Sequence, residues 1–256
     1  MSFKDHFSGH AESYASFRPR YSPQLFDFAA SLPRRRDLAW DCATGNGQAA
    51  VDLAERFVRV IATDASEQQI ALAVPHPRVE YRRALAEDSG LASGSVDLVT
   101  VASAAHWLDF DRFYAEVERV LAPGGALAVW TYNLPRIAPE LDPLVDRLAR
   151  NLVGPYWPPE RRWVNEEYRT LPFPFAEVEV PALWMEERWS LDRFLHYVGT
   201  WSATTRYLQA NGRDPRELIR GELESAWGDP DSPRTIRWPL MMRAGYPRVG
   251  VDFPAQ

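Results

Sequence analysis

The chain has 256 residues, 46% of them hydrophobic and 25% charged, which is the composition of a globular protein with enough apolar surface for a core. Its formal net charge of -6 argues against a nucleic-acid partner, whose binding face is usually basic. The single cysteine, Cys42, excludes an intrachain disulfide, and no apolar run approaches the roughly 18 residues of a membrane span. Because the N-terminus also lacks an apolar signal core, we expect a cytoplasmic protein with no membrane partner.

Residues 38–133 alternate between short apolar runs and amphipathic stretches. These patterns predict strands over 38–40, 58–63, 79–83, 96–102 and 126–132. Helices are predicted after Ser66 and over 49–57 and 110–121. Ser66 has the position of a helix N-cap, and Gln69 has the spacing of its capping-box partner. The order β-α-β-α-β-β-α-β favours a doubly wound α/β fold, in which helices cover both faces of a parallel sheet.

Residues 134–256 have a different composition, because prolines are frequent and seven of the ten tryptophans lie there. Helices are predicted over about 140–153, 191–209 and 214–226, and a strand over 178–185. We interpret this half as a mainly helical, aromatic-rich elaboration that recognises a substrate and packs against the sheet. Its aromatic residues suggest an aromatic-lined acceptor pocket. Four arginines could hold an acidic substrate, although most such residues are simply solvated, namely Arg136, Arg161, Arg162 and Arg188.

The turn after the first predicted strand has the pattern Asp41-x-Ala43-x-Gly45-x-Gly47. Glycine at such a turn permits positive φ and lets a ligand approach the backbone closely. The helix that follows presents free N–H groups at the positive end of its dipole. The turn is therefore a candidate ligand site.

The spacing of this turn fits two kinds of cofactor. It satisfies the dinucleotide fingerprint, and Asp64 follows Gly45 by 19 residues, as that fingerprint expects. An acid at Asp41 would repel a pyrophosphate but would attract the cationic ammonium and sulfonium of S-adenosylmethionine (SAM). Asp64 ends the second predicted strand, where a carboxylate can accept both hydroxyls of a ribose, or can simply cap the next helix. The charge argument favours SAM, and the spacing leaves a nicotinamide or flavin dinucleotide open.

Five segments, read together, resemble the successive motifs of class I SAM-dependent methyltransferases. They are 41–48 (DCATGNGQ), 64–66 (DAS), 86–88 (AED), 105–107 (AHW) and 121–125 (LAPGG). The His-Trp pair, with Tyr14-x-x-x-Arg18-Pro19-x-Tyr21 near the N-terminus, is similar to the trans-aconitate methyltransferase-like (methyltransferase type 11) subgroup. The resemblance covers residues 7–133, about half of the chain, and its combination of motifs is specific where each one alone is weak.

This resemblance implies a Rossmann-like, seven-stranded sheet with one antiparallel strand near its edge. It also implies three regions: an N-terminal helical lid over 1–36, a SAM-binding core over 37–133, and the substrate-recognition elaboration with the final sheet strands over 134–256. The residues expected around SAM are Tyr14, Arg18, Asp41, Ala43, Thr44, Gly45, Gly47, Gln48, Asp64, Ala65, Ala86, Glu87, Ala102 and Ser103. Ala43 departs from the family pattern, which has glycine at that position.

Within that set, the resemblance assigns different parts of SAM to different residues. The methionine part is expected beside Asp41, Gly45, Gly47 and Gln48. Asp64 is expected to bind the ribose, and Ala65, Ala86 and Glu87 are expected around the adenine. Ala102 and Ser103 are expected to line the pocket below the methionine, and Tyr14 and Arg18 belong to the lid, with Arg18 near the carboxylate of SAM.

His106 and Trp107 follow the fourth predicted strand, at the edge of the sheet where ligands bind. His106 is a candidate general base or a contact to cofactor or acceptor, and Trp107 is a candidate pocket wall. The five histidines show no metal-ligand spacing, so no catalytic metal is expected. The sequence thus predicts a methyltransferase acting on a small-molecule acceptor, with a carboxylic acid as one candidate. An NAD(P)-dependent oxidoreductase and a non-catalytic SAM-binding regulatory protein are the alternatives.

Overall fold

The computed structural model of the protein describes residues 17–248. In this part of the chain eight strands form one sheet in the order β3-β2-β1-β4-β5-β8-β6, and β7 also pairs with β8. The strands are β1 (Leu38–Cys42), β2 (Arg59–Asp64), β3 (Val79–Arg83), β4 (Val96–Ala102), β5 (Leu121–Tyr132), β6 (Ala176–Glu177), β7 (Leu183–Trp189) and β8 (Arg234–Tyr246). The described α-helices are α2 (Pro23–Ser31), α3 (Gln48–Ala54), α4 (Glu67–Ala71), α5 (Phe110–Val120), α6 (Asp142–Asp146), α7 (Arg161–Asn165), α8 (Leu191–Gly199), α9 (Ser202–Asn211) and α10 (Arg220–Trp227).

Strands β1 to β5 are parallel, as the alternation of elements predicts. Leu25 of α2 and Leu53 of α3 pack in one buried cluster, and Phe113 and Val117 of α5 pack in the other. Helices therefore cover both faces of the sheet, which confirms the doubly wound α/β fold. The strand order reverses between β1 and β4, and a sheet of this kind opens a crevice at the carboxyl ends of those strands.

At the outer edge of the sheet, the resemblance implies one strand, but the structure has two short strands. Strand β8 is antiparallel to β5, and its other edge pairs with both β6 and β7. The predicted strand over 178–185 begins later than expected, at Leu183, and continues to Trp189. The segment between β6 and β7 contains Pro181, which has no N–H to donate to the ladder, so pairing lapses there. The expected single edge strand is thus present as two shorter ones, giving eight strands instead of seven.

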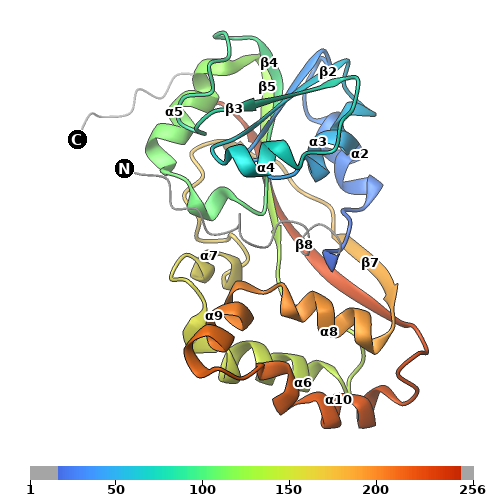
Figure 1. Cartoon of the computed structure of the whole chain (residues 1–256). Helices are drawn as coiled ribbons and strands as arrows, with labels where there is room; N and C mark the ends of the chain where they lie inside the picture. The colour runs from blue at the N-terminus through green and yellow to red at the C-terminus, as the bar shows by residue number, and fades with distance from the viewer. Residues whose placement is uncertain (1–16, 249–256) are drawn as a thin grey trace.

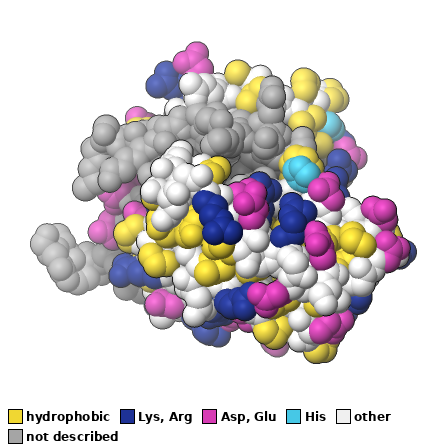
Figure 2. Space-filling model, turned by 60° about the horizontal axis from the view of Figure 1, so that its bottom comes forward, with side chains coloured by type: hydrophobic (Ala, Val, Ile, Leu, Met, Phe, Trp, Pro, Cys, Tyr) yellow, Lys and Arg dark blue, Asp and Glu magenta, His cyan; other side chains and the backbone are white. Residues whose placement is uncertain are grey.

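The described C-terminal helices gather at one end of the molecule. Figure 1 shows the long strands β5 and β8 extending from the parallel part of the sheet toward α6, α8 and α10. Figure 2 views this end, where basic and acidic side chains lie interspersed on the described surface. Ion pairs such as Arg147–Glu222 and Arg220–Glu224 contribute to that pattern. Within residues 17–248, no helix is both long enough and apolar enough to cross a bilayer.

Some element boundaries differ from the sequence prediction. The helix expected over 191–209 is two helices, because the chain turns at Thr200 and Trp201, between α8 and α9. The stretch over 214–226 begins as a 3₁₀ turn at Pro215–Leu218 before α10. Strand β5 begins at Leu121, since the Pro-Gly-Gly segment lies within the strand as an irregularity in its pairing with β4.

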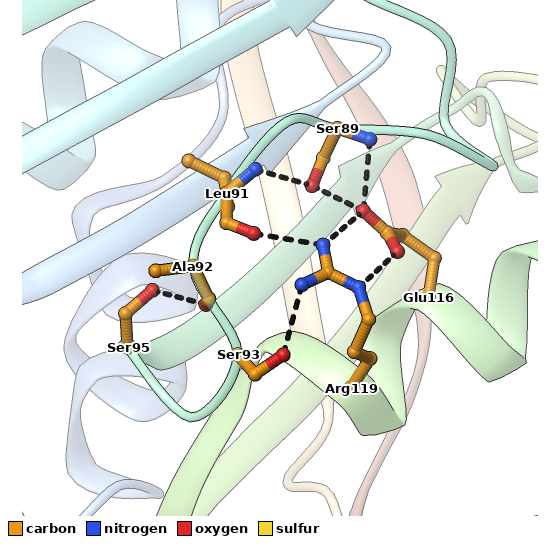
Figure 3. Close-up of polar contacts among 7 residues, drawn as sticks. All are labelled: Ser89, Leu91, Ala92, Ser93, Ser95, Glu116 and Arg119. Carbon is orange, nitrogen blue, oxygen red and sulfur yellow. Dashed lines mark hydrogen bonds and ion pairs between the residues drawn. The ribbon is translucent and has the colours of Figure 1, made fainter.

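A network of charged hydrogen bonds ties the loop between β3 and β4 to helix α5 (Figure 3). The Glu116 carboxylate accepts from the backbone N–H of Ser89 at 2.8 Å and also from the Ser89 hydroxyl. Arg119 donates to both oxygens of Glu116, to the Leu91 carbonyl at 2.8 Å and to the Ser93 hydroxyl at 3.1 Å. Arg119 and Ser89 together lower the pKa of Glu116 to about 2.

Replacing Glu116 with Gln should destabilise the protein by about 1–3 kcal/mol at pH 7, because a buried carboxylate that accepts several donors is lost. The carboxyl titrates at 4.5 ordinarily and at about 2 when folded, so its stabilisation is complete above pH 4.5 and is lost as pH falls toward 2. Urea unfolding of wild type and Glu116→Gln at pH 7 and pH 3 measures both effects. Glu118→Gln, on the exposed side of α5, is the matched control. Equal losses in the two variants would contradict the role given to the network.

Candidate functional site

A large cavity lies at the carboxyl ends of β1, β2 and β4, with a volume of about 1040 Å³. It lies at the edge of the sheet where the sequence places the candidate turn. Ten of the residues predicted to surround a cofactor line it, namely Ala43, Thr44, Gly45, Gln48, Asp64, Ala65, Ala86, Glu87, Ala102 and Ser103. The loop that Glu116 and Arg119 anchor is the same one that brings Ala86 and Glu87 to the wall.

Asp64 connects the end of β2 to the turn after β1. Its carboxylate accepts the backbone N–H of Gly45 at 2.9 Å and that of Ser66 at 2.8 Å. The N-cap of α4 is Ser66, whose hydroxyl accepts from the Gln69 N–H at 3.3 Å, as the sequence predicts. Asp64 therefore does not cap the helix itself. Asp64 also lines the cavity, which places its carboxylate beside any ligand bound there.

Asp41 lies behind the turn and does not line the cavity. Its side chain is fully buried and accepts hydrogen bonds from the Thr44 hydroxyl at 2.5 Å and the Thr100 hydroxyl at 2.8 Å. Burial raises the pKa of Asp41 to about 6. The expectation of a direct contact to a cationic ligand thus does not fit its position, because the carboxylate turns inward to two hydroxyls and organises the turn from below.

Gly47 also does not line the large cavity. Packing explains why glycine is present at this position. It is the N-cap of α3 with φ +85°, and a Cβ atom there would overlap the ring and hydroxyl of Tyr81. Any side chain at this position would be strained by both backbone and neighbour. The second glycine of the turn is therefore required by α3 and β3, and not by close approach of a ligand.

Two residues other than glycine adopt positive φ on the cavity wall. Ala43, after β1, and Ser103, after β4, both have φ of 54°. This left-handed conformation costs an L-residue roughly 1–2 kcal/mol. Strained backbone of this kind gathers at ligand sites, where the surrounding structure maintains it. The Ala43 position is the one where the family pattern has glycine, so the departure from the pattern coincides with backbone strain.

A second, smaller cavity of about 80 Å³ adjoins the first, and Ser103 and Trp107 line both. Arg18 lines the smaller cavity only, where it donates to the Tyr132 hydroxyl at 2.9 Å and to the Thr200 carbonyl at 3.2 Å. The sequence places Arg18 beside the carboxylate of SAM, but in the structure Arg18 lies at the neighbouring, smaller cavity. Tyr14, expected in the same lid, lies outside the described residues.

His106 also lines the smaller cavity, on the 3₁₀ turn after β4. Its Nδ1 lies 2.8 Å from the Tyr168 hydroxyl, and its ring centroid is 4.8 Å from that of Trp107. Burial, and then the charge of Arg161, lower the pKa of His106 to about 3. The imidazole is therefore neutral at pH 7 and is poorly suited to hold a proton taken from an acceptor.

The two cavities differ in the charge of their walls. Five carboxylates and one arginine line the large cavity, namely Asp64, Glu87, Asp109, Asp111, Glu160 and Arg112. The smaller cavity is lined by two arginines, Arg18 and Arg161, and by no acid among the described residues. No group of three His, Cys, Asp or Glu residues within 17–248 is placed to hold a metal ion. The large cavity thus suits a cationic ligand and the smaller one an anionic ligand.

The aromatic-rich half contributes fewer pocket residues than its composition suggests. Trp189, Trp227 and Trp238 are buried in the core, and Trp184 is half exposed on the edge strand. Trp157 and Trp201 line the smaller cavity. Trp189, Trp227 and Trp238 therefore stabilise the packing of helices on β7 and β8.

The wall of the large cavity also includes Tyr21, which the sequence places in the N-terminal lid motif, and two acids that sequence reasoning missed, Asp109 and Asp111. The hydroxyl of Tyr21 lies 3.1 Å from that of Ser103, at the junction of the two cavities. Its place in the N-terminal motif was the only signal for it. The sequence pattern assigns Asp109 and Asp111 to the N-terminal turn of a helix, and the structure agrees, with Asp109 as the N-cap of α5. The same two residues also line the cavity.

Replacing Ala43 with Gly should stabilise the protein by about 0.5–1 kcal/mol. Glycine removes the strain of the left-handed backbone, and the greater entropy of glycine in the unfolded state offsets part of that stabilisation. Thermal and urea unfolding measure the change. The control is Ala115→Gly on the exposed face of α5, which should destabilise by about 0.5–1 kcal/mol. If Ala43→Gly destabilised the protein as much as the control does, the strain at residue 43 would not be real.

Comparison with known proteins assigns the chain to a family. Residues 40–129 match a family model described as a methyltransferase domain. A Dictyostelium discoideum protein, itself provisionally named as a methyltransferase, is 35% identical over 90% of this chain and 89% of its own length. An uncharacterized methyltransferase of Mycobacterium tuberculosis is 34% identical over 68% of this chain and 67% of its own length.

A solved structure from Anaeromyxobacter dehalogenans, provisionally described as a type II methyltransferase, agrees over nearly the whole fold. It is 49% identical with a TM-score of 0.87, and the match covers 91% of this chain and all of the other. None of these matches names the trans-aconitate subgroup, which stays an expectation. Domain match, relative and structure agree with the motifs on the cavity wall, and the chain belongs to the class I family of SAM-dependent methyltransferases.

Proposed function

We propose that the protein methylates a small organic acid, which binds in the smaller cavity while SAM occupies the large one. The observation that carries this proposal is the contact between two cavities of opposite charge at Ser103 and Trp107. A donor in one cavity and an acceptor in the other would meet at that shared wall. The small volume of the second cavity favours a compact acceptor over a polymer.

The residues of the large cavity fit SAM. Bound there, SAM supplies an electrophilic methyl group on a positively charged sulfur. Asp64, on the cavity wall, would accept the two ribose hydroxyls with its carboxylate. Ala86 and Glu87 approach the adenine from the anchored loop, and Thr44 and Gln48 approach the methionine part from the turn after β1. Carboxylates around the cavity favour a ligand that carries net positive charge at its reacting end.

A carboxylate acceptor needs little chemical help from the protein. One of its oxygens forms a bond to the methyl carbon with a lone pair, while the carbon–sulfur bond breaks and its electrons stay on sulfur. No proton moves, so a general base is not required. The contribution of the protein is to hold acceptor and methyl group in line in a site with little water, which is worth several orders of magnitude in rate.

His106 fits this chemistry as a wall residue. Its neutral imidazole, hydrogen-bonded to Tyr168, can orient an acceptor without changing its own protonation state. A hydroxyl or amine acceptor would instead need a base whose pKa lies near the working pH. We therefore assign His106 to acceptor positioning.

Asp64→Asn should weaken SAM binding by about tenfold or more, because the variant loses the charge and one of the two acceptor oxygens offered to the ribose. Calorimetric titration with SAM measures this, with Asp231→Asn, an exposed residue far along the chain, as control. An unchanged dissociation constant would remove the ribose role. Tight NADPH binding by the wild type without SAM binding would overturn the proposed function, and SAM binding with no transfer of labelled methyl to any organic acid would favour a regulatory protein.

The His106 imidazole should stay neutral down to about pH 4. Its pKa is about 3 in the folded protein and 6.5 ordinarily, so between these values the unfolded state binds a proton that the folded state does not. The contribution of the neutral His106 ring to the free energy of unfolding is therefore fully present above pH 6.5 and decreases as pH is lowered toward 3. NMR titration of the ring reports the pKa, and His196, exposed on α8, serves as the internal reference. A His106 pKa near 6.5 together with a matching loss of activity below it would restore the general-base role.

A further inference from the structure

Arg161 is held rigidly in the smaller cavity, at the start of α7. Its Nη2 donates to the Asn133 side-chain oxygen at 2.9 Å, and its Nε donates to the Asn165 side-chain oxygen at 3.3 Å. The guanidinium carbon lies 4.3 Å from the centroid of the Trp157 ring. A guanidinium has five N–H donors, so these two hydrogen bonds leave others available in a fixed orientation.

The charge of Arg161 has no carboxylate partner among the described residues. Its neighbours Asn133 and Asn165 are neutral, and no Asp or Glu oxygen of residues 17–248 forms an ion pair with it. Burial lowers the pKa of Arg161 to about 10, and the charge of Arg18 acts in the same direction, so the group remains a cation at pH 7. A desolvated cation in this position is costly unless an anion joins it.

Arg18 extends the same positive surface from the N-terminal side. Its guanidinium is oriented by the Tyr132 hydroxyl and the Thr200 carbonyl and lies 5.6 Å from the Tyr197 ring centroid. Trp157 and Trp201 complete the lining with flat apolar faces, their ring centroids 5.8 Å apart. The cavity therefore combines two cations with aromatic walls, which suits an organic anion and disfavours a cationic acceptor.

We propose that Arg161, with Arg18 beside it, binds one carboxylate oxygen of the acceptor and so selects anionic acceptors for this enzyme. This assignment rests on the proposed function, because it places the acceptor in the smaller cavity. Arg161 does not line the large cavity, so the second carboxylate oxygen is the one directed to the shared wall at Ser103 and Trp107. Methylation turns that carboxylate into a neutral ester, which no longer pairs with the arginines and leaves the site.

The structure offers a matched control next to Arg161. Arg162 has the same charge and the same helix, and its guanidinium carbon lies 4.4 Å from the Trp163 ring centroid. It is exposed and does not line the smaller cavity. A loss confined to Arg161 variants is thus specific to the cavity, whereas a loss shared with Arg162→Gln reflects only net charge.

Binding of benzoate, benzamide and methyl benzoate tests the subsite without depending on turnover. The full-length protein, loaded with the demethylated form of SAM, is titrated by calorimetry or ligand-observed NMR. Wild type should prefer benzoate over its two neutral analogues by about tenfold or more, as expected for a charge-assisted pair. Arg161→Gln should abolish this preference, Arg161→Lys should keep part of it, and Arg162→Gln should keep all of it. SAM affinity should be unchanged in all variants, and circular dichroism should show that each variant is folded at the titration temperature.

Three results would overturn the assignment. Equal binding of benzoate and benzamide by wild type, or failure of both to bind at millimolar concentration, would show that no anion subsite exists. Retention of the preference in folded Arg161→Gln would remove this residue from it. Stronger binding of phenyl phosphate than of benzoate would assign the cavity to phosphate esters. Retention of the preference in Arg161→Gln removes only the role of this residue and leaves the proposed function standing, whereas a wild type that binds no SAM, or that has no anion subsite, contradicts the proposed function itself.

Discussion

Two cavities of opposite charge meet at one wall, and the chemistry of the site depends on that arrangement. The carboxylates of the large cavity come from four separate segments, at the ends of β2 and β3, at the start of α5 and before α7. The parallel sheet brings the first of these together, since the carboxyl ends of its strands lie at one edge. The arginines of the smaller cavity come from the N-terminal segment and from α7. Both halves of the chain therefore contribute to both cavities, since Arg18 and Arg161 line the smaller one and Glu160 joins Asp64 and Glu87 on the wall of the large one.

The residues that lie where the sequence places them, at the cavity wall, depend on local signals. Asp64, Ser66 and Gly45 belong to a strand end, a helix cap and a turn, each of which is specified by neighbours in the chain. The positions that differed from expectation depend on contacts distant in sequence. Asp41 turns inward to Thr100, and Arg18 is oriented by Tyr132 and Thr200, contacts that no local pattern encodes.

The same distinction explains the fold. Strands β1, β2 and β4 follow the predicted ranges closely, because buried parallel strands have continuous apolar runs bounded by polar turns. The division of the outer edge at Pro181 and the break between α8 and α9 were not apparent, because both depend on how β8 is covered. Composition predicts an aromatic-rich C-terminal half, but it does not predict which tryptophans line a cavity. Trp157 and Trp201 lie at the smaller cavity, whereas Trp189 and Trp238 lie in the core, and only the packing determines this difference.

Charge also gives the proposed reaction a direction. Before transfer, a sulfonium faces carboxylates across one cavity and a carboxylate faces arginines across the other, so both ligands are held by opposite charge. After transfer, the sulfur is a neutral thioether and the acceptor is a neutral ester. The smaller cavity then loses the charge pairing with its ligand, and the large cavity loses the part that the sulfonium supplied, while the ammonium of the cofactor remains. The walls that attract the two substrates therefore bind the two products less tightly.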